Sequence, residues 1–141
     1  MRFYLDSMVW IYALEGNPKF GVLAQGLLQK LRSGYHTLLV SEFLLGEVLV
    51  LPVRKSDTFL IASYRRLMLP SATVEVVPFS NHTGLNFASL RALHRTTPPD
   101  SIHLALAASA NADFFITGDE RLNKLTIPGI GQIVDLNANI P

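Results

Sequence analysis

Four acidic residues that lie far apart in the chain, Asp6, Glu47, Asp100 and Asp119, each fall where an apolar strand or helix is expected to meet an edge of the fold. A carboxylate set against an apolar run costs folding free energy unless a cation or hydrogen-bond donors compensate its charge. Four carboxylates brought together cannot all ionise comfortably without a cation. Oxygen ligands favour a hard ion, Mg²⁺ or Mn²⁺, over zinc. If these edges coincide in space, the four residues predict a divalent-metal site.

The chemistry that such a site supports is hydrolysis of a phosphodiester bond. A divalent ion, or a pair about 4 Å apart, lowers the pKa of a bound water, orients it in line with phosphorus and neutralises charge on the leaving oxygen. The chain has no Cys, which excludes thiolate zinc sites and cysteine nucleophiles. It also lacks a serine nucleophile motif, a glycine-rich phosphate loop and a dinucleotide fingerprint. Metal-assisted hydrolysis is therefore the reaction that these residue types favour.

The elements that must position these acids alternate between strands and helices. Apolar runs with turn signals predict strands at residues 2–5, 37–40, 73–79, 113–117 and 132–136. Helical spacing and capping residues predict helices at residues 7–14, 20–31, 41–51, 57–69, 80–95, 98–110 and 120–125. This alternation implies a mostly parallel sheet covered on both faces, with right-handed crossovers. We therefore expect one α/β domain over residues 1–141, a three-layer α/β/α fold with a central five-stranded sheet.

Local signals set the expected helix ends. Ser7 and Ser41 suit N-cap positions, and Pro52 is expected to stop the helix that begins after Ser41. Pro98 suits the first helical position, which places Asp100 in a first turn. In a parallel sheet the helices begin at the carboxyl edge of the strands, where open α/β sheets bind ligands. That rule places all four acids at one edge.

Composition limits the function classes. The 12 basic and 11 acidic side chains give a net charge of +1. The protein therefore lacks the strong overall electrostatic field that is typical of a polyanion binder. Any RNA-backbone contact must come from local patches, and we expect it at two basic pairs, Arg54 with Lys55 and Arg65 with Arg66. Apolar stretches are interrupted well short of the roughly 20 residues of a membrane span. We expect a cytoplasmic protein that does not enter a membrane.

Four segments of the sequence resemble one known family. They are residues 4–7 (Tyr-Leu-Asp-Ser), 41–49 (Ser-Glu-Phe-Leu-Leu-Gly-Glu-Val-Leu), 99–105 (Pro-Asp-Ser-Ile-His-Leu-Ala) and 115–119 (Phe-Ile-Thr-Gly-Asp). In order and spacing these segments resemble the PIN-domain ribonucleases, in particular the VapC-like toxins of bacterial type II toxin–antitoxin pairs. The resemblance runs from residue 3 to about residue 136, nearly the whole chain.

This resemblance implies a Mg²⁺- or Mn²⁺-dependent endoribonuclease, an RNA substrate, a cognate antitoxin and a homodimer. It also implies that the metal ligands and catalytic acids are Asp6, Glu47, Asp100 and Asp119. Thr117 resembles the hydroxyl position that family members place beside the last acid. Two positions depart from the pattern, because Ser7 stands for the usual Thr and Gly118 for the usual Asn. His103 is expected to support the site rather than to act as its base.

Other readings stay open. Each acid also has an ordinary structural role, since Asp6 or Asp119 can cap a helix and Asp100 can favour the positive end of its helix. A non-catalytic PIN-fold module that binds RNA or protein would keep the same fold. A phosphohydrolase with Asp6 as nucleophile would need a second acid two residues later, and Met8 occupies that place.

Overall fold

The structure is a computed structural model and describes residues 1–140. Its elements are, in chain order, β1 (Arg2–Leu5), α1 (Ser7–Glu15), α2 (Gly21–Ser33), β2 (Thr37–Val40), α3 (Glu42–Arg54), α4 (Thr58–Leu67), β3 (Val74–Val76), α5 (Asn81–Leu93), α6 (Pro98–Ser109), β4 (Phe114–Thr117), α7 (Glu120–Asn123) and β5 (Gln132–Asp135). The predicted alternation of strands and helices is confirmed.

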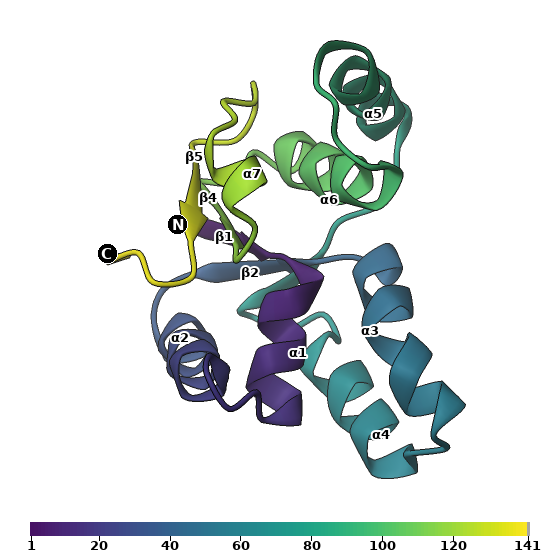
Figure 1. Ribbon diagram of the computed structural model, residues 1–141, viewed down its shortest axis with the longest axis vertical. Coiled ribbons are helices and arrows are strands. Elements are labelled where there is room, and N and C mark those ends of the chain that lie inside the picture. Colours follow the sequence, from purple (N-terminus) through teal and green to yellow (C-terminus); the bar gives the residue numbers. More distant parts are fainter. Residues whose placement is uncertain (141) are drawn as a thin grey trace.

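A five-stranded sheet lies at the centre of the molecule (Figure 1). The strand order is β3-β2-β1-β4-β5, and each neighbouring pair is parallel. β1 is the middle strand, so the first residues of the chain pair on one side with β2 and on the other with β4. Because the strands are parallel, their carboxyl ends lie at the same edge of the sheet. The sheet is thus fully parallel rather than mostly parallel.

The two faces of the sheet are covered by different helices. Phe3 and Leu5 belong to a buried cluster with side chains of α1, α2, α3 and α4. Tyr4, which alternation along the strand directs to the other face, belongs to a second cluster with side chains of α5, α6 and α7. Figure 1 shows these two groups of helices on opposite sides of the sheet. The predicted three-layer α/β/α fold is therefore confirmed.

Two expected helix ends are wrong. Asp6, not Ser7, is the N-cap of α1, because the Asp6 carboxylate accepts a hydrogen bond from the Ser7 amide. α3 continues through Pro52 to Arg54. Pro52 lies in the last turn, where the carbonyl groups of Leu51 and Pro52 still accept bonds from the amides of Lys55 (3.0 Å) and Asp57 (2.9 Å).

Several other expected elements differ in length. The strand expected at residues 73–79 covers Val74–Val76, and the helix expected at residues 120–125 ends at Asn123. Within residues 1–140, no helix is long and apolar enough to cross a membrane.

Candidate active site

Asp6 is a buried carboxylate at the carboxyl end of the middle strand. Its side chain accepts hydrogen bonds from the Ser7 amide (2.7 Å) and from the Thr117 hydroxyl (2.8 Å), and the residue is 7% exposed. Burial raises the pKa of Asp6 above its ordinary value, and the charge of Asp100 raises it further, while His103 and the hydrogen bonds oppose the shift. Burial is the largest cause, so the surroundings of Asp6 favour its protonated form.

Thr117 connects Asp6, at the end of β1, with the backbone of Asp119 at this edge. It is fully buried at the end of β4, and its hydroxyl donates to Asp6 and accepts a hydrogen bond from the Asp119 amide (3.1 Å). One hydroxyl therefore fixes the Asp6 carboxylate and the backbone that carries Asp119. The family resemblance implied a hydroxyl beside the last acid, and its support of a catalytic site stays a prediction.

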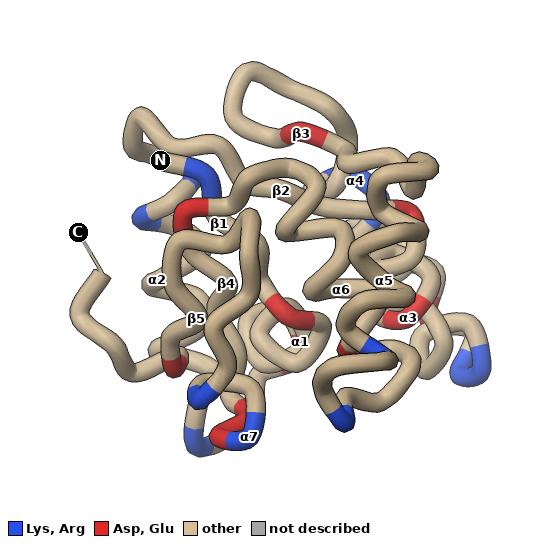
Figure 2. Tube along the Cα trace, turned by 90° about the horizontal axis from the view of Figure 1, so that it is seen from above, with Lys and Arg blue, Asp and Glu red and all other residues tan. Residues whose placement is uncertain are grey.

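Asp119 is held by a neighbouring cation. It is the N-cap of α7, and its carboxylate accepts bonds from the side chain of Arg121 at 2.7 and 3.1 Å. The Arg121 side chain lowers the pKa of Asp119 below its ordinary value. Figure 2 shows basic and acidic residues side by side in the α7 segment. Asp119 therefore serves as a cap and is paired with an arginine.

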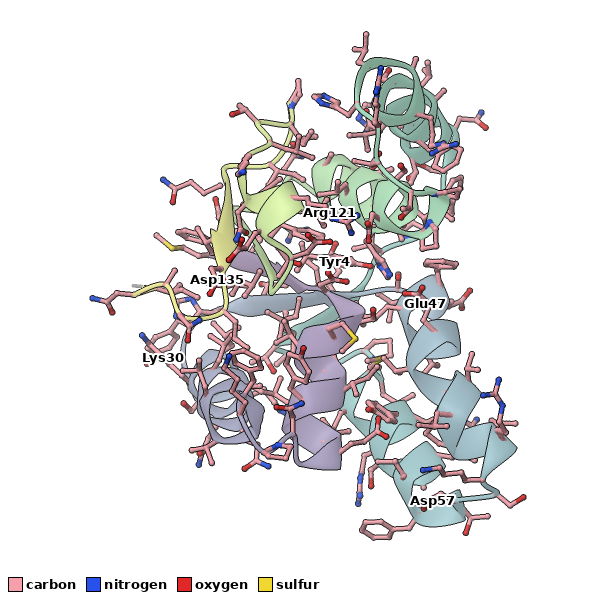
Figure 3. All side chains as sticks on the ribbon, viewed as in Figure 1. Tyr4, Lys30, Glu47, Asp57, Arg121 and Asp135 are labelled. Atoms are coloured by element: carbon pink, nitrogen blue, oxygen red, sulfur yellow. The ribbon has the colours of Figure 1, made fainter. Side chains whose placement is uncertain are left out.

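Glu47 is tied to a buried histidine. Its Oε1 hydrogen-bonds Nε2 of His103, which is 1% exposed, and Nδ1 of His103 lies 2.8 Å from the Tyr4 hydroxyl. The Tyr4 hydroxyl in turn lies 3.1 Å from the hydroxyl of Ser41, the N-cap of α3. Burial raises the pKa of Tyr4 well above its ordinary value, so its hydroxyl stays protonated. Figure 3 shows Tyr4 and Glu47 where the sheet meets α3.

Asp100 lies in the first turn of α6, as Pro98 predicted. Thr97 caps this helix, and its hydroxyl accepts a bond from the Asp100 amide at 3.4 Å. The charge of Asp100 acts on both Asp6 and Arg121. Asp100 is therefore near enough to influence both the buried carboxylate and the arginine of the ion pair at α7.

The four predicted acids occur in three arrangements. Asp6 and Asp100 are electrostatically coupled, whereas Glu47 is bound to His103 and Asp119 to Arg121. Within residues 1–140, no group of three or more His, Asp or Glu side chains lies close enough to hold a metal ion in this conformation. The donor set nevertheless fits a hard divalent cation, because it consists of carboxylates and one of them, Asp6, is buried without an ion pair within residues 1–140.

The two positions that depart from the family pattern are accommodated. Ser7 is the first residue of α1, and its hydroxyl lies 3.4 Å from Asp6 Oδ1. A Cβ atom added at Gly118 would meet no heavy atom within 4 Å. The orientation of Asp119 depends instead on Thr117 and Arg121.

The predicted RNA-contact residues lie on the hairpin of α3 and α4. Arg54 and Lys55 are at the turn between these helices, next to Asp57, which Figure 3 places at the far end of the hairpin from Tyr4. Arg65 and Arg66 are in the last turn of α4. All four side chains are exposed, and they form two separate pairs rather than one patch.

Three residues around the acids were not recognised from the sequence. Tyr4 and Ser41 complete the hydrogen-bonded chain to Glu47, and Arg121 pairs with Asp119. The spacing of Arg121, two residues after an expected N-cap acid, was an available signal. Tyr4 gave no such signal, because its partner His103 lies 99 residues away.

Comparison with known proteins indicates the family of this chain. A model of the PIN domain family matches residues 3–128. No curated protein sequence matches the chain.

Solved structures of similar fold include three bacterial proteins. VapBC2 from Rickettsia felis, bound to a DNA fragment from its promoter, has 18% identity and a TM-score of 0.73, with 96% of this chain and 98% of that chain covered. A toxin–antitoxin complex from Klebsiella pneumoniae has 20% identity and a TM-score of 0.67, with 90% and 93% covered. VapC20 from Mycobacterium tuberculosis, described as a toxin that cleaves the sarcin–ricin loop, has 16% identity and a TM-score of 0.62, with 80% and 86% covered. The structures share the fold, and the family match over most of its length shows that this chain belongs to the PIN domain family.

Proposed function

We propose that this protein is a metal-dependent endoribonuclease that hydrolyses RNA phosphodiester bonds. The observation that carries the proposal is the buried Asp6 carboxylate, whose pKa is raised by burial and by the charge of Asp100 at the carboxyl edge of a PIN-domain sheet. A buried acid with such a shift marks a candidate functional site. The similarity in fold to VapC20, a sarcin–ricin loop cleaving toxin, supports RNA as the substrate.

Four carboxylates would hold the cation. Asp6 and Asp100 are the first candidates, because they already interact through their charges. Glu47 and Asp119 would join them on exchanging their present partners. The cation, Mg²⁺ or Mn²⁺, would supply an activated water and neutralise charge at the scissile phosphate.

The surrounding residues keep these acids in place. Thr117 and Ser7 orient the Asp6 carboxylate through hydrogen bonds. His103, held by Tyr4, fixes the side chain of Glu47 at the start of α3. Exposed Arg54, Lys55, Arg65 and Arg66 would contact the RNA backbone outside the site.

The same proposal includes partners and location. Two of the similar structures are toxin–antitoxin assemblies, VapBC2 and the Klebsiella pneumoniae complex, which supports an antitoxin as a partner of this chain. The hairpin of α3 and α4 offers an apolar surface for it, with Val50, Val53 and Phe59 55–79% exposed. We further propose that the protein is a homodimer in the cytoplasm, where its RNA substrate is found.

Cleavage of RNA tests the proposal. The wild-type protein should cleave a mixture of cellular RNAs with Mn²⁺ or Mg²⁺ and lose this activity in EDTA. Asp6→Asn removes the central carboxylate and should abolish cleavage. Asp57→Asn is the matched control, because it makes the same change at an exposed helix cap that Asn also satisfies. Unchanged cleavage by Asp6→Asn would rule out the proposed site.

A non-catalytic role is the second candidate function. It is favoured by one observation, namely that Glu47 and Asp119 each already have a cationic or hydrogen-bonding partner. Such a module would bind RNA or protein without cleaving it. Tight Mn²⁺ binding without cleavage of any RNA tested would support this candidate over the nuclease.

A further inference from the structure

A cleft lies beside the acidic edge, on the α5 and α6 side of the sheet. Its volume is about 370 Å³, within the range of pockets that take small ligands. Its lining includes Leu93, Arg95, Thr96, Thr97, Asp100 and Arg121. Asp100 is therefore part of both the cleft and the candidate metal site, so a ligand in the cleft would lie next to this acid.

The cleft offers both charged and apolar contacts. Arg95 and Arg121 provide guanidinium groups beside the Asp100 carboxylate. Arg121 is paired with Asp119, whereas Arg95 has no ion pair within residues 1–140. The apolar lining includes Leu93, which is 79% exposed. A ligand that suits this lining carries an anionic group for Arg95 and an apolar group for Leu93 in one unit.

The loop that forms the cleft is held in place. A guanidinium nitrogen of Arg91 donates to the carbonyl of Thr96, and the Thr96 hydroxyl hydrogen-bonds Ser101 in α6. Thr96 is 8% exposed, and Thr97 caps α6. These hydrogen bonds hold the backbone between α5 and α6 that lines the cleft.

We propose that this cleft is a nucleotide subsite, which binds one ribonucleotide of the RNA next to the bond that is cleaved. This inference rests on the proposed function. Arg95 contacts the phosphate, and Leu93 contacts the face of the base. A ribonucleotide combines the two required groups, and a nucleotide placed against Asp100 leads the chain onto the acids. Arg121, which is paired with Asp119, adds a second guanidinium group to the lining of the cleft.

The test measures RNA binding separately from cleavage. A fluorescently labelled single-stranded RNA is titrated with the full-length protein in EDTA at low ionic strength, and anisotropy reports binding. Arg95→Gln and Leu93→Ser are the test variants, and both side chains are exposed, so neither change should disturb folding. Arg32→Gln is the control, because it removes the same charge from an exposed position in the last turn of α2, on the opposite side of the sheet.

We expect Arg95→Gln to weaken binding about tenfold, as for loss of one hydrogen bond to a charged group. It should also reduce the slope of log affinity against log salt by about 0.7, the share of one phosphate contact in a single strand. Arg32→Gln should change neither quantity. A nucleoside monophosphate should displace the RNA at lower concentration than inorganic phosphate does, and Leu93→Ser should remove that difference because the base has lost its contact.

The outcomes separate this subsite from the nuclease assignment. Wild-type affinity in both Arg95→Gln and Leu93→Ser would overturn the subsite, even if the wild-type protein cleaves RNA with Mn²⁺. Absence of RNA binding by the wild-type protein would overturn it as well. Weakened binding in both variants would support the subsite, even if no RNA is cleaved and the nuclease assignment fails.

Discussion

Replacement of Thr117 by Val should separate metal binding from packing at the acidic edge. The two side chains have nearly the same shape, so the change removes a hydroxyl and leaves the volume of a fully buried side chain intact. The lost hydroxyl donates to the Asp6 carboxylate at 2.8 Å and accepts the Asp119 amide at 3.1 Å. The Asp119 amide then loses this acceptor, and the Asp6 carboxylate loses one of its donors while it keeps the Ser7 amide.

The expected magnitude follows from the bond to the Asp6 carboxylate, which is the stronger of the two. A hydrogen bond to a charged group contributes about 1.5–3 kcal/mol to the free energy of unfolding. With an unfolding entropy of about 0.3 kcal/mol/K for a chain of this length, the melting temperature should fall by about 5–10 °C. A partner that orients a metal ligand usually contributes 10–100-fold in affinity. We therefore expect Thr117→Val to bind Mn²⁺ about 10–100-fold more weakly.

Thr117→Ser is the matched control, because it keeps the hydroxyl and deletes a methyl group. That deletion should cost about 0.5–1.5 kcal/mol, as other buried methyl deletions do. Thermal melts without metal and Mn²⁺ titration by electron paramagnetic resonance measure the two effects. The Ser variant should lose stability but bind Mn²⁺ like the wild-type protein. Equal Mn²⁺ affinity in the Val variant and the wild type would refute the reasoning, because it would mean that Thr117 does not orient a metal ligand.

Three further predictions concern the same edge. In the metal-free protein the raised pKa of Asp6 lets the folded state hold a proton to higher pH than the unfolded state does. The free energy of unfolding should therefore fall as pH rises from the ordinary aspartate pKa through the raised one. Urea titrations across this range should show no such fall in Asp6→Asn, and a fall of the same size in this variant would contradict the prediction. Arg121→Gln frees the Asp119 carboxylate and should tighten Mn²⁺ binding, as measured by calorimetry. Lys124→Gln is the control, because it removes the same charge from an exposed side chain three residues later and should leave Mn²⁺ binding unchanged. Equal tightening by both variants would mean that only the net charge matters, which would contradict the prediction. Tyr4→Phe leaves Nδ1 of the buried His103 without its hydrogen-bond partner. This change should lower the free energy of unfolding, measured in urea, by about 1–3 kcal/mol. A variant as stable as the wild-type protein would show that this bond contributes nothing.

The sequence predicted the backbone of the site better than its side-chain contacts. Asp6 could be placed because an acid that ends an apolar strand lies at the carboxyl edge of a parallel sheet. Asp100 could be placed because Pro98 fixes the start of α6. These predictions depend on local signals and on the general topology of α/β folds, both of which can be read without knowing which side chains meet.

The remaining contacts depend on residues that are distant in sequence or on side-chain geometry. The bond between Tyr4 and His103 joins β1 to α6, and no local pattern indicates it. The pairing of Arg121 with Asp119 depends on the conformation of an exposed side chain. Pro52 was expected to end α3, but the helix continues to Arg54, and the carbonyl groups of Leu51 and Pro52 accept bonds from the amides of Lys55 and Asp57.

The central place of β1 has a consequence for synthesis of the protein. The first strand can complete its pairing only when β4 exists, and Asp6 can meet Thr117 only after 111 further residues have been added. A nascent chain on the ribosome therefore carries Asp6 from early in synthesis, but the edge that surrounds this acid can assemble only after residue 117 has been translated.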